Sequence, residues 1–524
     1  MQDASQKTRI AGLCSSRFYD ELDHEVDFSH SPKCSNESSS RGTTFSSRAV
    51  DRVSKFESSS TSGSCGQLVH NYSSTLTFSP EGSPTSQLDS RSHRGLQKDS
   101  HSVDDLSLKL RELEKVMLGS NPEILDLYDV NVSVEAEKWK DLIEMISIGE
   151  GGLKEVLFAC AKAVGENDSI RIECLVSELR TMVSVSGEPI QRLGAYMLEG
   201  LVARLASSGS SICRALKCRE PVAGPNLLSY MHELYEMCPY FKFGYLSANG
   251  AIADAMKDED RVHIIDFQIA QGSQWISLIQ ALATRPGGAP KIRITGIDDS
   301  FSAYARGGRL EIVGRRLAQL AESCNVPFEF HSVTVPAFEV KFEHLGIRPG
   351  ETIAVNFPLM LHHVPDESVC TENHRDRLIR LSKSLSPRVV TLVEVESNTN
   401  TAPFYPRFLE TFDYYSAVFH SIDVALPRDN RKRISVEQHC LARDIVNLIA
   451  CEGMERFERH EPLGKWRSRF AMAGFRPHPL SSFVNATIRG LLKGYCENYT
   501  LEEQDGALLL GWMNRPLVSS CAWT

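Results

Sequence analysis

Short apolar segments alternate with amphipathic helices through the middle of the chain, and this order constrains the fold more than any other feature. The strand-like segments are residues 261–266, 291–298, 326–333, 352–357 and 389–395. Between them apolar residues recur at helical spacing, as in Leu310, Val313 and Leu317. Right-handed crossovers between such strands build a parallel sheet with helices on both faces. We therefore predict an α/β fold with a doubly wound, mostly parallel sheet, closed at one edge by an antiparallel hairpin over 507–512 and 517–523.

The chain divides into three parts by composition. Residues 1–101 are serine-rich and poor in Leu, Ile and Val, so they cannot bury enough apolar area to offset the entropy of ordering the chain. We predict a disordered N-terminal tail there. Residues 102–150 form a linker in which leucines at helical spacing predict one short amphipathic helix. Residues 151–524 form the folded domain, and two or three helices over 153–206 predict a helical cap on it.

Net charge bears on whether the chain binds nucleic acid. The formal net charge is −10, so affinity for a phosphate backbone requires a local basic face. The best candidate is the run from Arg428 to Arg433. We favour a solvated loop between helices for this run over a phosphate-binding patch or a nuclear-import signal. Direct DNA binding is therefore expected to be weak or indirect.

The sequence contains few patterns of membrane, metal or cofactor sites. No apolar run approaches the roughly 20 residues of a membrane span, and the Met1 end lacks a signal pattern, so we expect a soluble intracellular protein. The 14 cysteines are scattered without a C-x-x-C pair, which favours reduced thiols over a zinc cage or a disulfide framework. Metal-spaced His/Cys clusters, a Ser-His-Asp order and a phosphate-binding Gly-Lys-Ser loop are also missing from the sequence. We predict no metal and no cofactor.

Three motifs in order make a family resemblance specific. The residues of these motifs are Val262, His263, Ile264, Ile265 and Asp266, then Pro403, Phe404, Tyr405 and Arg407, and finally Trp466, Trp512 and Trp523. Through them the sequence resembles the VHIID, PFYRE and SAW motifs of the plant GRAS-domain family, over about residues 153–524. Pro406 interrupts the second motif, and it suits the first turn of the helix that follows.

The resemblance implies a function. Residues 268–274, 304–308 and 393–401 are similar to the branch named for phytochrome-A signal transduction, which includes chitin- and gibberellin-responsive members. GRAS proteins are plant transcriptional regulators, so the resemblance implies a nuclear co-regulator in light, hormone or stress signalling, with a cytoplasmic pool left open. Its implied partners are other GRAS proteins and DNA-binding transcription factors, particularly of the zinc-finger type. Homodimers and heterodimers are left open.

The GRAS core also resembles the class I methyltransferase fold, which raises the question of an active site. After its first strand, such an enzyme carries an acid and then alternating glycines, because only glycine lets the backbone approach the cofactor closely. Here Asp266 supplies the acid, Gln268 and Ala270 fill the first two glycine positions, and only Gly272 is retained. We therefore predict that the chain is not a working enzyme.

Two further residues keep a small-ligand hypothesis open. Asp298, at the end of the second strand, stands where an acid commonly accepts hydrogen bonds from ribose hydroxyls. His362 resembles the histidine base of plant O-methyltransferases, although packing beside the cleft is the favoured interpretation. The alternative to a protein-binding regulator is thus a ligand sensor or an S-adenosylmethionine-dependent methyltransferase that uses Asp266, Gln268, Gly272, Asp298 and His362.

Overall fold

The computed structural model describes residues 152–205, 225–298 and 310–524, all of them in one compact unit. The predicted tail over 1–101 and the linker helix within 102–150 lie outside these residues. In the described part the predicted α/β class is confirmed. Five strands, each followed by a helical connection, alternate with helices as the sequence indicates.

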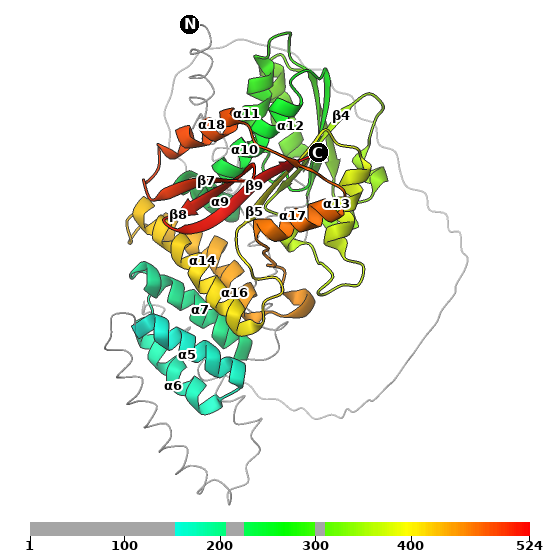
Figure 1. Cartoon of the computed structure of the whole chain (residues 1–524). Coiled ribbons are helices and arrows are strands. Elements are labelled where there is room, and N and C mark those ends of the chain that lie inside the picture. The colour runs from blue at the N-terminus through cyan, green and yellow to red at the C-terminus, as the bar shows by residue number, and fades with distance from the viewer. Residues whose placement is uncertain (1–151, 206–224, 299–309) are drawn as a thin grey trace, which may run out of the picture. The chain divides into compact units, whose positions relative to one another are not determined.

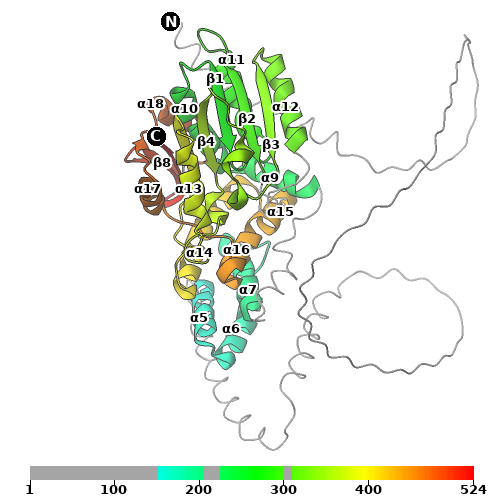
Figure 2. The same cartoon turned by 90° about the vertical axis from the view of Figure 1, so that its right-hand side faces the viewer.

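One sheet of nine strands forms the centre, in the order β3-β2-β1-β4-β5-β9-β8-β7, with β6 paired to β9. The first five strands in this order are parallel, and Figure 2 shows β3, β2, β1 and β4 side by side. Their bounds are β1 Arg261–Asp266, β2 Lys291–Ile297, β3 Phe328–Val333, β4 Thr352–Pro358 and β5 Val389–Val395. All five agree with the predicted strands to within two residues.

The other half of the sheet is antiparallel. The predicted C-terminal hairpin is confirmed as β8, Ala507–Trp512, and β9, Arg515–Trp523, with β9 joined to β5. The hairpin does not end the sheet, however, because β7, Tyr499–Gln504, pairs with β8, and β6, Pro477–His478, pairs with β9. The sheet is therefore more mixed than predicted. The sequence gives little indication of β7 because its outer half is polar and exposed, as edge strands often are.

Helices cover both faces of the sheet, and the alternation of side chains along each strand sorts the core into two layers. Ile264 of β1 and Ala354 of β4 pack in one layer, whereas Ile265 and Val355 pack in the other. The first layer is covered by α10 Tyr240–Ala255, α11 Ser273–Ala283, α12 Leu310–Ser323 and α18 Ser482–Leu492. The second is covered by α13 His374–Ser384 and α17 Leu463–Met472. The doubly wound arrangement is thus confirmed.

The predicted helical cap is present. It consists of α5 Gly152–Glu166, α6 Ser169–Met182 and α7 Pro189–Leu205, together with α14 Phe404–Ala425 and α16 Ala442–Ala450 (Figure 1). A buried stripe of Val156, Leu157, Cys160 and Ala161 faces the cap interior. The long helix α14 packs on α5, α7 and α16 and also contacts β8 and β9. It therefore connects the cap with the antiparallel half of the sheet.

Most of the remaining elements are short. They are α9 Pro225–Met237, α15 Arg431–Val436, the 3-10 turns η1 Ala337–Glu339, η2 Phe342–Leu345, η3 Leu361–His363 and η5 Gly453–Glu455, and the π-helical turn η4 Glu437–Leu441. The basic run was predicted to be a loop, but a helix begins at Arg431, because the Asn430 side chain caps it by accepting from the backbone of Lys432.

The structure also bears on the predictions about membrane spans and about the cysteines. Within the described ranges, none of the helices combines the length and the apolar character of a membrane span. Eight described cysteines are free thiols, four of them buried. Cys451, in contrast, is disulfide-bonded, so the expectation that all thiols are reduced is wrong for this residue.

Candidate functional site

The carboxyl end of β1 carries Asp266, whose carboxylate is surrounded by N–H donors of its own chain. Trp275 Nε1 donates to Oδ2 at 2.8 Å, while Oδ1 accepts from the Gln268 backbone at 3.2 Å and from Asn356 Nδ2 at 3.3 Å. Burial raises the pKa of Asp266 to about 7, although these donors favour its ionised form. Asp266 thus fastens the start of α11 to the sheet.

Buried amides extend this arrangement across the sheet. Asn356 of β4 donates to Gln274 Oε1 at 3.0 Å, and Gln274 donates to Asn249 Oδ1 of α10 at 3.1 Å. Thr391 of β5 donates to Asn356 Oδ1 at 2.8 Å. We call Asn249, Asp266, Gln274, Trp275, Asn356 and Thr391 the Asp266 network. It links two helices to three adjacent strands through hydrogen bonds within the protein.

The loop after β1 keeps a glycine-like backbone without the predicted glycines. Ala270 is exposed and adopts a left-handed conformation with φ +46°, and Gly272 follows with φ +76°. A Cβ on Gly272 would lie 2.9 Å from Val313 Cγ1 and 3.2 Å from Leu317 Cδ1 of α12. Gly272 is therefore required for packing between α11 and α12. Gln268 is half-buried beside it.

Asp298 directly follows β2, where it is half-buried, and its backbone donates to Val333 O at 3.2 Å. The structure thus places Asp266, Gln268, Gly272 and Asp298 at one end of adjacent strands, as predicted. None of them lines the cavity of about 630 Å³ that lies between α9, the end of α14 and Tyr495.

His362 lies on the opposite face of the sheet from the Asp266 network. It belongs to η3, which follows β4, and its Nδ1 lies 2.5 Å from Glu394 Oε2 of β5. Glu394 is on the face of Leu392, whereas Thr391 is on the face of Asp266, because side chains alternate along β5. His362 Nε2 lies 3.5 Å from Glu458 Oε2. Both ring nitrogens of this buried histidine therefore face carboxylates, and the structure does not bring His362 together with Asp266.

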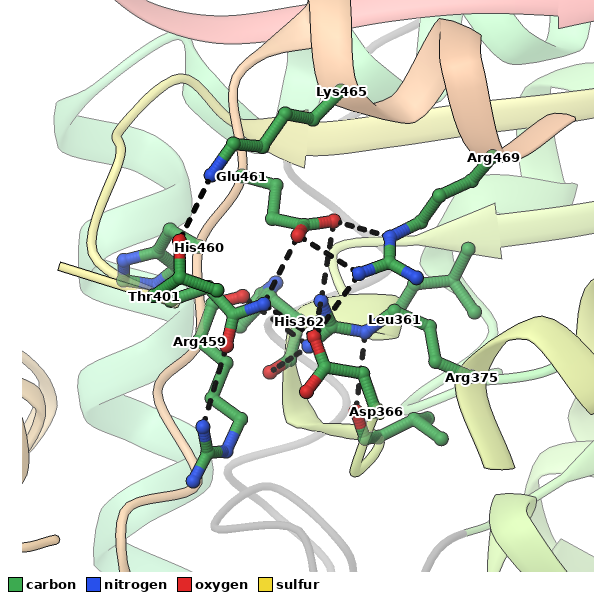
Figure 3. Close-up of polar contacts among 12 residues, drawn as sticks. Leu361, His362, Asp366, Arg375, Thr401, Arg459, His460, Glu461, Lys465 and Arg469 are labelled. Atoms are coloured by element: carbon green, nitrogen blue, oxygen red, sulfur yellow. Dashed lines mark hydrogen bonds and ion pairs between the residues drawn. The ribbon is translucent and has the colours of Figure 1, made fainter. Parts of the chain in front are cut away.

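A buried set of ions surrounds the backbone of η3 (Figure 3). Arg375 donates to the His362 and Val364 carbonyls and pairs with Asp366 and Glu461, each at 3.3 Å. Arg469 pairs with the same two carboxylates, at 3.0 Å and 2.6 Å. We call Asp366, Arg375, Glu461 and Arg469 the arginine–carboxylate cluster. Burial opposes ionisation of Asp366, but Arg375 and the hydrogen bonds from Ser368 and Asn400 outweigh it and lower its pKa to about 2.

Comparisons with known proteins identify the family. The model of the GRAS domain family matches residues 153–524. The chain belongs to the GRAS domain family. It is 62% identical to chitin-inducible gibberellin-responsive protein 2 of Oryza sativa subsp. japonica, over 87% of this chain and 86% of the relative. It is 66% identical to Scarecrow-like transcription factor PAT1 of Arabidopsis thaliana, over 80% of this chain and 86% of the relative.

A solved structure supports the same assignment. The crystal structure of SCL7 from Oryza sativa is similar with a TM-score of 0.64 and 34% identity, covering 71% of this chain and 99% of that one. Among the relatives, PAT1 is named a transcription factor, another is named for its response to chitin and gibberellin, and a more distant one is named a DELLA protein. The function of this group of GRAS proteins is the regulation of transcription in plant signalling.

The first GRAS motif builds the sheet. Val262, Ile264 and Ile265 are buried in the two core layers. His263 Nδ1 accepts from Arg293 at 3.0 Å, so the ring proton is on Nε2 and is donated to Thr295 Oγ1 at 2.8 Å. Burial and then Arg293 lower the pKa of His263 to about 4. His263 is thus a neutral connector between β1 and β2.

The second GRAS motif joins cap helices. Pro403 precedes α14, and Pro406 occupies its first turn, as predicted. Arg407 is buried, donates to Leu448 O at 2.8 Å and pairs with Glu452 at 2.5 Å, which holds α14 against the end of α16. The Arg204 guanidinium lies 3.9 Å from the centre of the Phe404 ring. Tyr405 is half-buried against the core.

The tryptophans of the third GRAS motif are buried. Trp466 lies against Arg375, Trp512 donates to His420 Nδ1 at 3.2 Å, and Trp523 stacks on Phe470 with ring centres 4.9 Å apart. Each exposes 1% of its surface or less. These motif residues are therefore placed to hold the GRAS domain together, and their side chains are not available on its surface.

Sequence reasoning missed most of the residues that surround His362 and the segment 361–366. Glu394 could have been found from the alternation of β5, where an acid stands between Val393 and Val395. Glu458, Glu461 and Arg469 could not, because they lie about a hundred residues further along the chain. Only the fold brings them to η3.

Proposed function

We propose that this GRAS protein regulates transcription through contacts with other proteins and that its sheet carries no working methyltransferase site. The observation that supports this most is the Asp266 carboxylate, whose oxygens already accept three hydrogen bonds from the same chain. A nucleoside at the end of β1 would have to displace these donors. Unpaired buried polar groups are costly, so such binding would be weak.

The basic run supports an indirect relation to DNA. Arg433 is fully buried and pairs with Glu437 at 2.6 Å. Arg428 pairs with Glu188 and Asp423, and Lys432 pairs with Glu233 at 2.5 Å. Since these three side chains are already paired with acids and the whole chain is acidic, phosphate contacts of this run contribute little.

The proposed partners are DNA-binding transcription factors, particularly of the zinc-finger type, and other GRAS proteins, including a second copy of this chain. The proposed location is the nucleus, with a cytoplasmic pool. The names of the relatives support the regulatory role. The regulator would be recruited to promoters by its partners.

A ligand sensor is the second candidate. Asp298 is half-buried at the end of β2, next to the loop that contains Gly272. In doubly wound folds, ligands bind outside the carboxyl ends of the strands. A sensor would bind there without methyl transfer.

The experiment that tests the proposal has two parts. Fluorescence anisotropy with the purified full chain should show only weak, salt-sensitive binding to DNA duplexes. Affinity purification of the tagged chain from plant nuclei, followed by mass spectrometry, should recover DNA-binding transcription factors. Nanomolar, sequence-selective binding of the isolated chain at physiological salt would contradict the proposal and make direct DNA recognition the function.

A further inference from the structure

Three imidazoles converge on one buried carboxylate beneath η3. His362 and His363 come from η3, while Glu458 and His460 come from the segment between η5 and α17. The donor atoms of His362, His363 and Glu458 all lie within 4.8 Å of one another. These side chains expose 8% of their surface or less. The sequence indicated no metal-spaced cluster, since His363 and Glu458 are 95 residues apart.

The spacing of these atoms suits a metal ion. Glu458 Oε1 lies 3.1 Å from His363 Nε2, and Oε2 lies 3.5 Å from His362 Nε2 and 2.9 Å from His460 Nε2. Around a tetrahedral ion with bonds of about 2.0–2.1 Å, two ligand atoms lie about 3.4 Å apart. Small side-chain shifts would therefore complete the site.

A second carboxylate orients one of the histidines as metal sites require. Glu394 only accepts hydrogen bonds, so the His362 proton is on Nδ1, 2.5 Å from Glu394 Oε2. Glu394 is itself fixed, since its Oε1 accepts from the Leu361 backbone at 2.8 Å. In the neutral ring, the Nε2 lone pair then faces an oxygen of Glu458. A carboxylate that holds the far nitrogen of a ligating histidine is the usual outer partner of a metal.

His363 is also open to ligation. Among the described residues its buried Nδ1 has no hydrogen-bond partner. Nε2 donates to Glu458 Oε1 at 3.1 Å, because a carboxylate only accepts. For Nε2 to bind an ion, the ring proton would move to Nδ1.

We propose that His362, His363 and Glu458 bind a divalent ion of the zinc class, with Glu394 as the group that orients His362 and His460 as a hydrogen-bond partner of Glu458. Imidazoles with one carboxylate suit zinc, whereas magnesium and calcium take oxygen ligands. Three protein ligands leave one position of a tetrahedral ion for a water molecule. The ion would fasten residues 456–462 to η3 as the GRAS domain folds, and this role is independent of the proposed regulatory function.

Metal titration of the purified full chain tests the proposal. The protein is stripped with a chelator under reducing conditions and titrated with Zn²⁺, and bound metal is measured by mass spectrometry after dialysis. Wild type should retain about one more equivalent than His363→Gln. The matched control His478→Gln, a half-buried histidine outside the cluster, should behave as wild type. Glu394→Gln should weaken binding about 10- to 100-fold, as loss of an outer partner does.

Cobalt distinguishes this site from the cysteines. Co²⁺ bound at the site should show the visible absorption of a tetrahedral ion without a thiolate charge-transfer band. If His363→Gln does not fold, the melting temperature of wild type is compared with and without Zn²⁺, and a rise that Glu394→Gln diminishes supports the site. Equal zinc binding by wild type and the variants, or no retained ion in wild type, would overturn it and leave an imidazole–carboxylate network that holds only protons.

Discussion

The Asp266 network and the arginine–carboxylate cluster lie on opposite faces of the same parallel strands. Their buried carboxylates are stabilised by different kinds of partner. In the Asp266 network a single carboxylate is surrounded by amide, indole and backbone N–H groups. In the arginine–carboxylate cluster Asp366 and Glu461 are each shared by Arg375 and Arg469. The difference shows in the pKa, which is raised for Asp266 and lowered for Asp366.

This contrast predicts which substitutions should destabilise each face of the sheet most. Removal of one ion from the arginine–carboxylate cluster leaves a buried charge without compensation, which is among the costliest changes in a protein. Removal of one neutral donor from the Asp266 network costs a single hydrogen bond, and near neutral pH the carboxylate can take up a proton. The substitutions below compare the two faces, in order of decreasing expected effect.

Arg375→Met should destabilise the fold most. Arg375 is fully buried and compensates both Asp366 and Glu461, so its loss should lower the free energy of unfolding by about 3–5 kcal/mol. The control is Arg348→Met, since Arg348 pairs with Glu329 on the surface, where solvent screens the pair, and its loss should destabilise the fold far less. The free energy of unfolding of both variants is measured by urea denaturation. An equal loss of stability in the two variants would show that the buried ions are not stabilised as we infer.

Trp275→Phe should have a smaller effect. It keeps most of the ring but removes the donor to Asp266 Oδ2, and an unsatisfied buried carboxylate oxygen costs about 1–3 kcal/mol. Trp512→Phe removes a donor to the exposed His420 and should cost less, because water can replace the donor. A larger loss for Trp512→Phe in urea unfolding would contradict the importance of the Asp266 network.

The pH dependence of stability should reveal Asp266. Its pKa rises from 3.8 to about 7 on folding, so the folded state binds an extra proton between these values. The stability that this proton contributes is fully present below about pH 4 and is lost as the pH rises through about 7. The slope for one proton is at most about 1.4 kcal/mol per pH unit. In urea unfolding series, Asp266→Asn should flatten this decline between about pH 4 and 7, and an unchanged slope would place the titration elsewhere.

Ala270→Gly should stabilise the fold slightly. Ala270 is exposed and left-handed, a conformation that costs an L-residue roughly 1–2 kcal/mol and costs glycine nothing. Part of this gain is offset by the greater entropy of glycine in the unfolded chain, so we expect about 0.5–1 kcal/mol. Ala417→Gly, inside α14, should instead destabilise by about 1 kcal/mol. If both substitutions changed the melting temperature in the same direction, the loop after β1 would not be strained.

Much of the fold followed from local patterns. Strands β1 and β5 were predicted at their observed bounds, because their apolar runs are continuous and buried on both faces. β6 and β7 were missed, since a two-residue strand and a half-polar edge strand have little periodicity. The helix start at Arg431 was missed because the basic residues obscured the Asn430 cap.

The candidate site was less predictable. Asp266, Gln268, Gly272 and Asp298 follow neighbouring strands, so their shared edge could be inferred from the topology. His362 lies on the other face of the sheet because of the direction in which the chain turns after β4. No short-range sequence pattern predicts that direction. Its partner Glu458 enters from a segment 95 residues beyond the neighbouring His363, and distant contacts of this kind arise only from tertiary structure.

Isothermal titration of the full chain with S-adenosylmethionine tests the central claim most directly, namely that the Asp266 network is structural and not a cofactor site. The side chains of Gln268 and Ala270 and the filled acceptors of Asp266 should together cost several kcal/mol, and about 4 kcal/mol moves a micromolar ligand to millimolar. We predict no saturable heat at micromolar concentrations, for wild type and Asp298→Ala alike. Micromolar binding that Asp298→Ala abolishes would contradict the account and show that the carboxyl ends of β1 and β2 form a cofactor site.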